Sequence, residues 1–166
     1  IGAWVNGVSI WSYKSIESVQ FGPLTGIAVT GAGEGYDAGA KPNLEINGGG
    51  GTGATAEVEV NGSLTGFTVT NQGSGYTESP LVSIVGGGGS GATAQAIITG
   101  GKVTRILVEQ PGSGYTSQPS VSVTGGGGTG AEATAQVRGP ISKVNVTNFG
   151  SGYTSLPEVK VNSGEG

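Results

Sequence analysis

The five residues Gly73-Ser74-Gly75-Tyr76-Thr77 decide the fold of this chain, because the same stretch returns along the sequence. Identical copies stand at Gly112–Thr116 and Gly150–Thr154, and a degenerate copy stands at Gly33–Asp37. The copies therefore recur at intervals of about 39 residues, which is typical of a tandem-repeat architecture. Their tyrosines are Tyr36, Tyr76, Tyr115 and Tyr153.

Two further features keep the same interval. One proline follows each tyrosine, at Pro42, Pro80, Pro119 and Pro157. Runs of four glycines occupy Gly48–Gly51, Gly86–Gly89 and Gly125–Gly128. We therefore predict three complete units, at 23–62, 63–101 and 102–139, and a partial fourth unit at 140–166. Residues 1–22 precede the repeats and form a separate segment.

Each unit contains short stretches rich in β-branched residues, in which apolar and polar positions alternate as they do in strands. Strand a is predicted at Leu24–Thr30, Leu64–Thr70, Val103–Glu109 and Ile141–Thr147. Strand b is predicted at Leu44–Asn47, Leu81–Val85, Ser120–Thr124 and Glu158–Asn162. Strand c is predicted at Ala54–Val60, Ala92–Ile98 and Ala131–Val137. Because no segment keeps a helical period, we expect an all-β fold without helix, in which three-stranded repeats form a prism-like or solenoid-like array.

The spacing of apolar residues adds detail to these strands. Strand c begins with alanines, such as Ala92 and Ala94, and ends with a larger residue such as Ile98, so another backbone should pass close to its start. In strand a, the large apolar residues step by three and then by two, which indicates a β-bulge. Asn61-Gly62 and Gly100-Gly101 separate strand c from the next strand a and predict two antiparallel hairpins, because type I′ turns require positive φ. The core-facing pairs of strand b are predicted to be Val82 and Ile84, Val121 and Val123, and Val159 and Val161.

The first 22 residues hold both tryptophans of the chain and predict a hairpin around Asn6-Gly7. The aromatic residues of this segment are Trp4, Trp11, Tyr13 and Phe21. Two interpretations stay open. Terminal repeats need a cap over their apolar face, and aromatic residues are also favoured at protein–protein interfaces. The segment is therefore either a cap for the first repeat or a docking surface for another subunit.

The composition narrows the classes of function. Lys and Arg total 7 without clustering, and the net charge is −4, so the basic patch of a nucleic-acid-binding protein is absent from the sequence. No apolar run approaches the length of a membrane span, and no membrane insertion is expected. The lack of Cys and His removes thiolate zinc sites and the usual catalytic triads. The lack of Met, even at position 1, indicates a processed product or a part of a longer polypeptide.

Three patterns resemble chemical sites, but each fits a structural role better. The tetraglycines are not followed by the Lys and the helix that a phosphate-binding loop requires. Glu34 and Asp37 offer carboxylates for a lone cation, yet the repeated turns lack the Asp of a calcium-binding ladder. Glu57 and Glu59 share one strand face, as a glycosidase pair would, but the next unit has no acidic pair there. We therefore expect no enzyme activity, no catalytic residue, no cofactor and no metal.

The four tyrosines are the best candidates for binding a ligand. Spaced at one repeat interval, their rings would form a row that can stack on sugars. The alternative is that each ring fills a corner between strand a and strand b and that its hydroxyl group bonds to the backbone, as corner tyrosines do in β-sandwiches. The proline that follows at a fixed place favours the corner. The two glycines of the motif then supply positive φ.

A family resemblance rests on one unit of the repeat. The unit reads Val-Thr-Asn-Gln-Gly-Ser-Gly-Tyr-Thr from Val69 and continues through Pro80, Val82-Ser83-Ile84, Gly86–Gly89 and Gly91-Ala92-Thr93-Ala94. It resembles repeats of large virion structural proteins of tailed phages, especially T4-like cyanophages. The segment from Asn6 to Pro23 is similar to one that precedes such repeats. The repeat also occurs in bacterial surface and adhesin-like proteins.

The resemblance implies a non-enzymatic tail, baseplate, fibre or decoration component that resides in the virion and assembles with copies of itself or with other virion proteins. The alternative is an extracellular fibre subunit or a carbohydrate-binding adhesin module that contacts a host-surface glycan. The strands agree with an assembly role, because short strands leave open edges. Because the fourth unit is only partial and lacks a strand c, we expect an open edge there that accepts a strand from a neighbouring subunit. The N-terminal hairpin is a candidate for that donated strand.

Overall fold

The computed structural model describes residues 22–162, together with the short strands Trp4–Val5 and Val8–Ser9. These residues form strands and no helix, and the pairs of strands are antiparallel, so the predicted all-β class is confirmed. Within the same residues there is no helix long and apolar enough to span a membrane.

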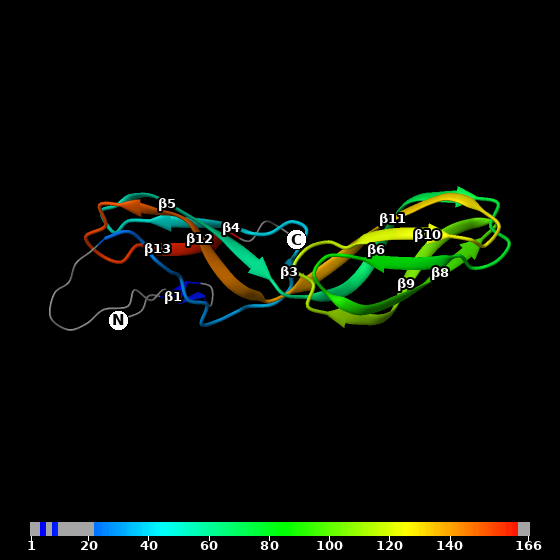
Figure 1. Ribbon diagram of the computed structural model, residues 1–166, viewed down its shortest axis with the longest axis horizontal. Coiled ribbons are helices and arrows are strands. Elements are labelled where there is room, and N and C mark those ends of the chain that lie inside the picture. The colour runs from blue at the N-terminus through cyan, green and yellow to red at the C-terminus, as the bar shows by residue number, and fades with distance from the viewer. Residues whose placement is uncertain (1–3, 6–7, 10–21, 163–166) are drawn as a thin grey trace. The chain divides into compact units, whose positions relative to one another are not determined.

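Figure 1 labels the strands in chain order. They are β1 (Trp4–Val5), β2 (Val8–Ser9), β3 (Tyr36–Asp37), β4 (Asn43–Asn47), β5 (Thr52–Val60), β6 (Ser63–Ser74), β7 (Leu81–Val85), β8 (Ser90–Thr99), β9 (Lys102–Ser113), β10 (Ser120–Thr124), β11 (Thr129–Gly139), β12 (Ile141–Ser151) and β13 (Glu158–Asn162).

The chain divides into two compact units, and each unit combines segments that are distant in sequence. Unit 1 comprises the described residues within 1–36, 40–60 and 140–166, and unit 2 comprises 37–39 and 61–139. Early and late parts of the chain thus fold together in unit 1, whereas the middle of the chain folds mainly on itself in unit 2.

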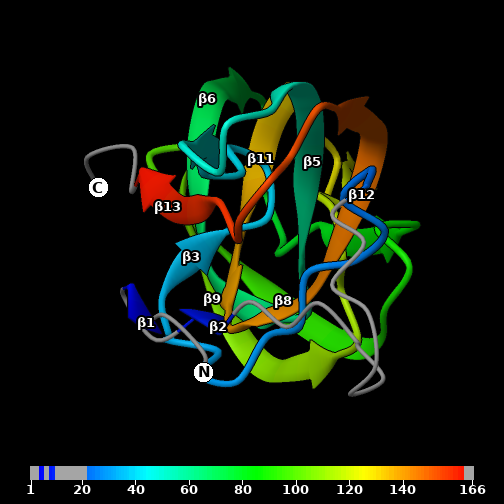
Figure 2. The same cartoon turned by 90° about the vertical axis from the view of Figure 1, so that its left-hand side faces the viewer.

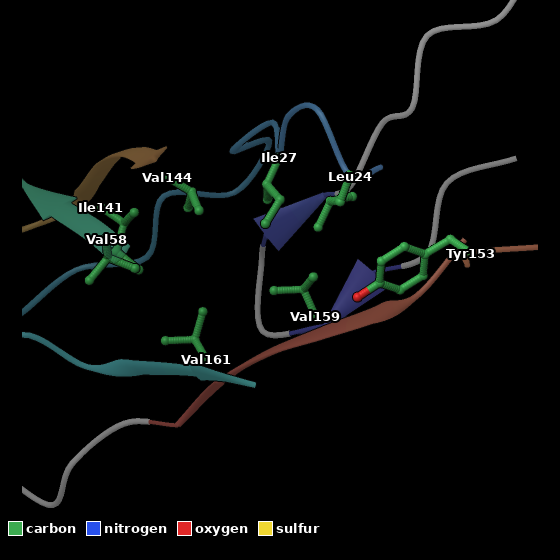
Figure 3. Close-up of a cluster of buried hydrophobic side chains, with 8 residues drawn as sticks. All are labelled: Leu24, Ile27, Val58, Ile141, Val144, Tyr153, Val159 and Val161. Atoms are coloured by element: carbon green, nitrogen blue, oxygen red, sulfur yellow. The ribbon is translucent and has the colours of Figure 1, made fainter. Parts of the chain in front are cut away.

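Unit 1 is built on two strand pairs, β5 with β12 and β4 with β13 (Figure 1). The register places Val60 opposite Ile141 and Asn43 opposite Asn162. Figure 3 shows the buried apolar cluster between these elements, with Tyr153 at one end. Its members are Leu24, Ile27, Val58, Ile141, Val144, Tyr153, Val159 and Val161.

Unit 2 contains one sheet in the order β10-β7-β8-β9 and a second sheet in which β11 pairs with β6. β8 and β9 lie side by side in both Figure 1 and Figure 2. One cluster of buried residues in the unit consists of Tyr76, Val82, Ala96, Val103 and Ile106. The predicted core-facing pairs of strand b are confirmed, since Val82, Val159 and Val161 are buried, and Ile84, Val121 and Val123 pack against the core of unit 2.

The predicted bulges of strand a are confirmed, and each places a hydroxyl residue outside the ladder. Thr104 is skipped between Val103 and Arg105 in the pairing of β9 with β8. Thr65 and Ser142 are skipped in the same way in β6 and β12. In each case the hydroxyl group donates to a carbonyl of the partner strand, and the acceptors are Ile97 O at 3.3 Å, Gln136 O at 3.3 Å and Glu59 O at 3.0 Å.

One of the two predicted hairpins is confirmed and the other is wrong. Gly100 and Gly101 have φ of 58° and 75°, and they close the β8–β9 hairpin. Gly62 is not among the glycines with positive φ, and its backbone exchanges hydrogen bonds of 2.8 and 3.1 Å with Tyr115. Asn61-Gly62 therefore makes no tight turn, and β5 and β6 do not pair with each other: β5 pairs with β12, and β6 pairs with β11.

The strand predicted at Leu24–Thr30 is also absent from the described structure. The segment forms a single bridge, between Ile27 and Val144, although Leu24 and Ile27 are buried in the core of unit 1. The closely similar stretch Leu64–Thr70 lies within β6, because β11 pairs with it along its length. Both stretches therefore bury apolar residues as their pattern predicts. Only Leu64–Thr70 forms a strand, because only this stretch has a partner strand along its length.

We expect the hydroxyl group at the bulge of β12 to stabilise unit 1. Ser142→Ala removes the bond to Glu59 O and should lower the free energy of unfolding by about 0.5–1 kcal/mol, because an exposed hydrogen bond contributes at the low end of the usual range. Urea unfolding followed by circular dichroism measures the change. Ser151→Ala, at the exposed end of the same strand, is the control and should change nothing. Equal stability of Ser142→Ala and the wild type would contradict the assignment.

Candidate functional site

Each tetraglycine lies against a Gly-Ser-Gly-Tyr-Thr corner from a different part of the sequence. Gly126–Gly128 lie against the corner of Tyr76, Gly87–Gly89 against that of Tyr115, and Gly49–Gly51 against that of Tyr153. We call each of these three contacts a glycine–tyrosine lock. The two motifs that recur along the sequence are thus the two halves of one interaction.

Backbone hydrogen bonds close each lock. The carbonyl oxygen of Gly126 accepts bonds from the amides of Thr77 and Glu78, with N···O distances of 2.8 and 3.3 Å. The other two locks repeat this double bond, from Thr116 and Ser117 to Gly87 O and from Thr154 and Ser155 to Gly49 O. One carbonyl therefore satisfies the two amides that follow the tyrosine, which a tight corner would otherwise leave without partners.

The four glycines of a run are required for two different reasons. The first three have positive φ, as shown by Gly125 at 81°, Gly126 at 68° and Gly127 at 77°. An L-residue adopts this conformation only at a cost. Gly128 lacks a positive φ, but a Cβ built there would overlap the ring of Tyr76. The last glycine thus leaves space for an aromatic ring, and Gly89 and Gly51 do the same for Tyr115 and Tyr153.

The corner contributes two glycines of its own. Gly73 and Gly75 have φ of 61° and 82°, as the motif predicted. A Cβ built at Gly73 would lie 2.6 Å from the amide nitrogen of Ala131, so the corner presses directly on the start of β11. The hydroxyl group of Tyr76 accepts a bond of 3.2 Å from that same amide. The alanines that begin strand c therefore mark the close approach of another backbone.

Three of the four corner tyrosines are buried. The exposed fractions are 4% for Tyr76, 2% for Tyr115 and 6% for Tyr153, and the rings of Tyr76 and Tyr153 belong to the cores of their units. A ring in this position has no free face for a sugar. Tyr36 differs, because it is only half-buried. The burial of the ring thus distinguishes Tyr36 from the other three tyrosines, whereas the regular spacing of the four in the sequence does not.

The corner of Tyr36 keeps its shape but has no tetraglycine against it in the described part of the chain. Gly33 and Gly35 have φ of 58° and 78°, close to the values at Gly73 and Gly75. A Cβ built at Gly35 meets nothing within 4 Å, whereas one at Gly75 would lie 3.6 Å from the Cα of Gly128. The first corner is therefore formed like the others but is not locked.

The remaining candidates from the sequence lie apart from the locks. Glu57 is exposed and pairs in register with Asn145, while Glu59 is half-buried and faces Lys143 across the ladder. Glu34 is exposed, and Asp37 accepts a bond of 2.7 Å from the amide of Gly39. The hairpin around Asn6-Gly7 is confirmed by the pairing of β1 with β2. Trp11, Tyr13 and Phe21 lie outside the described residues, and Trp4 is described only through its backbone.

The contact between the tetraglycines and the tyrosine corners was not predicted from the sequence. The signal was present, because both motifs recur at one interval of about 39 residues. The motifs that meet are nevertheless far apart in sequence, since Gly128 contacts Tyr76 and Gly51 contacts Tyr153. A periodic pattern shows which positions are equivalent, but it does not show which copies touch.

Comparisons with known proteins add nothing to this picture. The chain matches no protein-family model, no curated protein and no solved structure.

The two reasons for glycine can be separated within one run. Gly128→Ala places a methyl group into the ring of Tyr76 and should lower the free energy of unfolding by about 3 kcal/mol, the upper range for overpacking. Gly125→Ala meets open space and should cost only about 1 kcal/mol, because it strains φ alone. Urea unfolding followed by circular dichroism compares the two variants. Equal losses would show that the ring does not require the glycine.

The locked and unlocked tyrosines should also differ in their contribution to stability. Tyr115→Ala removes a ring that is 2% exposed and should cost about 3–5 kcal/mol, as other large aromatic truncations do. Tyr36→Ala removes a half-buried ring and should cost less than half as much. Thermal unfolding of both variants is the measurement. A loss at Tyr36 as large as that at Tyr115 would mean that the first corner is locked in solution.

Proposed function

We propose that this chain is a non-enzymatic structural protein that forms part of a virion, as a tail, baseplate, fibre or decoration component. Its tandem three-stranded repeats of about 39 residues form a prism-like or solenoid-like module within that assembly. The observation that carries the proposal is the glycine–tyrosine lock. In each lock, the two repeated motifs of the chain, the tetraglycine and the tyrosine corner, bind each other and join two distant segments of backbone.

The locks favour a structural role over ligand binding. A sugar-binding row would need exposed rings, because stacking uses the flat face of an aromatic side chain. Tyr76, Tyr115 and Tyr153 instead bury their rings against glycines, and the hydroxyl group of Tyr76 accepts a bond from the backbone. The three tyrosines therefore make contacts within the protein, and the repetition of their motif stabilises the fold.

The locks also suit a protein that must keep its shape under load. Each lock joins segments distant in sequence through two hydrogen bonds to one carbonyl and through a ring packed on a glycine. These contacts add to the antiparallel ladders, so a local opening must break several interactions together. The resemblance of the repeats to those of tailed-phage structural proteins is the support for proposing that this module belongs to a virion. Its partners are then copies of itself or other virion proteins.

A carbohydrate-binding adhesin module or an extracellular fibre is the second candidate. Its support is Tyr36, whose ring is half-buried and whose corner has no tetraglycine against it in the described residues. A single partly exposed ring is a weaker sugar site than a row of four. The adhesin therefore ranks below the structural role.

The structural role predicts association without glycan binding. Sedimentation velocity of the full chain at rising concentration should show oligomers, because short strands leave edges that pair with other chains. A chain that stays monomeric, with residues 1–20 protected from proteolysis, would contradict self-assembly through the N-terminal hairpin.

A glycan array completes the same test. The wild type should give the same background signal as Tyr36→Ala. A glycan that binds the wild type and Tyr115→Phe, but not Tyr36→Ala, would replace the structural proposal with the adhesin.

A further inference from the structure

We infer that the corner of Tyr36 is the binding site of the chain's own fourth glycine run, Ser163-Gly164-Glu165-Gly166, with Gly166 against the tyrosine ring. These four residues lie outside the described part of the chain, so the reasons come from the three described locks and from the strand that leads into the run. The inference goes beyond the proposed function, because it concerns a contact within the chain and holds whatever the chain assembles with.

The three described locks follow one order along the sequence. The third glycine run binds the second corner, the second run binds the third corner, and the first run binds the fourth corner. The order of the runs is thus the reverse of the order of the corners. In this order the fourth run, at residues 163–166, falls to the first corner, which is that of Tyr36.

The reversed order amounts to an exchange between two repeats. In unit 2, the repeats at 63–101 and 102–139 each place a glycine run against the tyrosine corner of the other. In unit 1, the repeat at 23–62 places Gly49–Gly51 against the corner of Tyr153, which belongs to the repeat at 140–166. A contact of the fourth run with Tyr36 completes the same exchange in unit 1.

The strands that lead into the runs are paired in the same reciprocal way. In the pair of β7 with β10, the last residue of each strand lies opposite the first residue of the other. β4 and β13 have the same register, with Asn43 opposite Asn162. A glycine run follows directly after β4, β7 and β10. Asn162, whose side-chain amide donates to Glu45 Oε1 at 2.6 Å, therefore fixes the point from which the fourth run starts.

The corner of Tyr36 presents its ring as a locked corner does. A Cβ built at Gly33 would lie 2.8 Å from Cε2 of Tyr36, and one built at Gly73 would lie 2.9 Å from Cε2 of Tyr76. The two glycines have φ of 58° and 61°. Each ring therefore lies over the first glycine of its own corner, and Tyr36 is set for the contact that Tyr76 makes with Gly128.

The fourth run keeps glycine where the backbone or the ring leaves least room. Gly166 stands at the position of Gly128, where a Cβ would overlap the ring of Tyr76. Gly164 stands at the position of Gly126, where a Cβ would lie 3.1 Å from the backbone nitrogen of Pro80. The first position accepts a side chain, since a Cβ at the first glycine of each described run meets nothing within 4 Å. A serine therefore fits there.

We expect this lock to be weaker than the other three. Ser163 and Glu165 stand where the other runs have glycines of positive φ, a conformation that an L-residue adopts only at a cost. The amide of Ala38 donates to Val137 O at 3.0 Å, whereas the equivalent amide of Glu78 donates to its glycine run. The double hydrogen bond of the other locks is therefore not repeated in full, and the ring contact is the main part of the fourth lock.

A weak lock on Tyr36 agrees with the smaller loss of stability expected for Tyr36→Ala. Only a loss as large as that of Tyr115→Ala would mean a lock as tight as the others. With Gly166 against its ring, Tyr36 would also lack the free face on which a sugar stacks.

A nuclear Overhauser spectrum of the full wild-type chain tests the contact directly. Cross-peaks should join the ring protons of Tyr36 to the α-protons of Gly166. The cross-peaks of Tyr153 with Gly51 in the same spectrum are the positive control, because that contact is described. Ser163 should give no cross-peak with the ring of Tyr36, since a Cβ at the first position of a described run meets no ring within 4 Å.

Two matched substitutions in the run measure the energetic coupling between the ring and the glycine. Gly166→Ala should lower the folding equilibrium constant by about fivefold or more, because its methyl group strikes the ring, whereas Ser163→Ala should change it by less than about twofold. In a chain that carries Tyr36→Ala, the loss caused by Gly166→Ala should also fall below about twofold, because the ring is gone. Urea unfolding followed by circular dichroism measures all three.

Two results would overturn the inference. One is a spectrum in which Tyr153 contacts Gly51 but Tyr36 does not contact Gly166. The other is a loss on Gly166→Ala that is the same with and without the ring of Tyr36. Neither result touches the proposed function, since a chain that forms oligomers without this lock keeps its structural role. A chain that stays monomeric but shows the Tyr36 contact keeps the lock and loses the assembly role.

Discussion

The packing of a tyrosine ring on a glycine that lacks a side chain is the contact on which the rest of the structure depends. It brings Tyr76 to Gly128 and Tyr153 to Gly51 across long stretches of sequence. Once the ring is in place, the carbonyl two residues before that glycine satisfies the amides that follow the tyrosine. The ladders of β6 with β11 and of β5 with β12 begin beside these locks. A single methyl group at the fourth glycine would therefore disturb a ring, a pair of hydrogen bonds and the start of a strand together.

This constraint changes how the repeated motif bears on function. A motif that recurs at a fixed interval invites the interpretation of a ligand site used several times. Here three of its four tyrosines are buried, so repetition reflects the fold. The informative copy is the degenerate one around Tyr36, where the same backbone conformation persists without its glycine partner in the described residues.

Much of the local structure could be predicted from residues close together in sequence. The all-β class, the bulges opposite Ile97 and Glu59, and the core-facing Val82, Val159 and Val161 follow from alternation and spacing. The hairpin at Gly100-Gly101 also follows, because two adjacent glycines adopt the positive φ that the turn requires. Asn61-Gly62 carries a similar local signal and makes no hairpin, since β12 offers β5 a complete ladder and Gly62 bonds to Tyr115.

The sequence by itself determined which residues are apolar on one face, where the backbone needs glycine, and how often the motif returns. Only the tertiary structure decided which copies meet. Leu24–Thr30 and Leu64–Thr70 have nearly the same residues, yet only the second lies in a strand. The physical reason is that a strand satisfies its backbone hydrogen bonds through a neighbour, and that neighbour is chosen by contacts distant in the chain. The alternation of apolar and polar side chains depends on residues that are close in sequence, whereas the pairing of strands depends on residues that are distant.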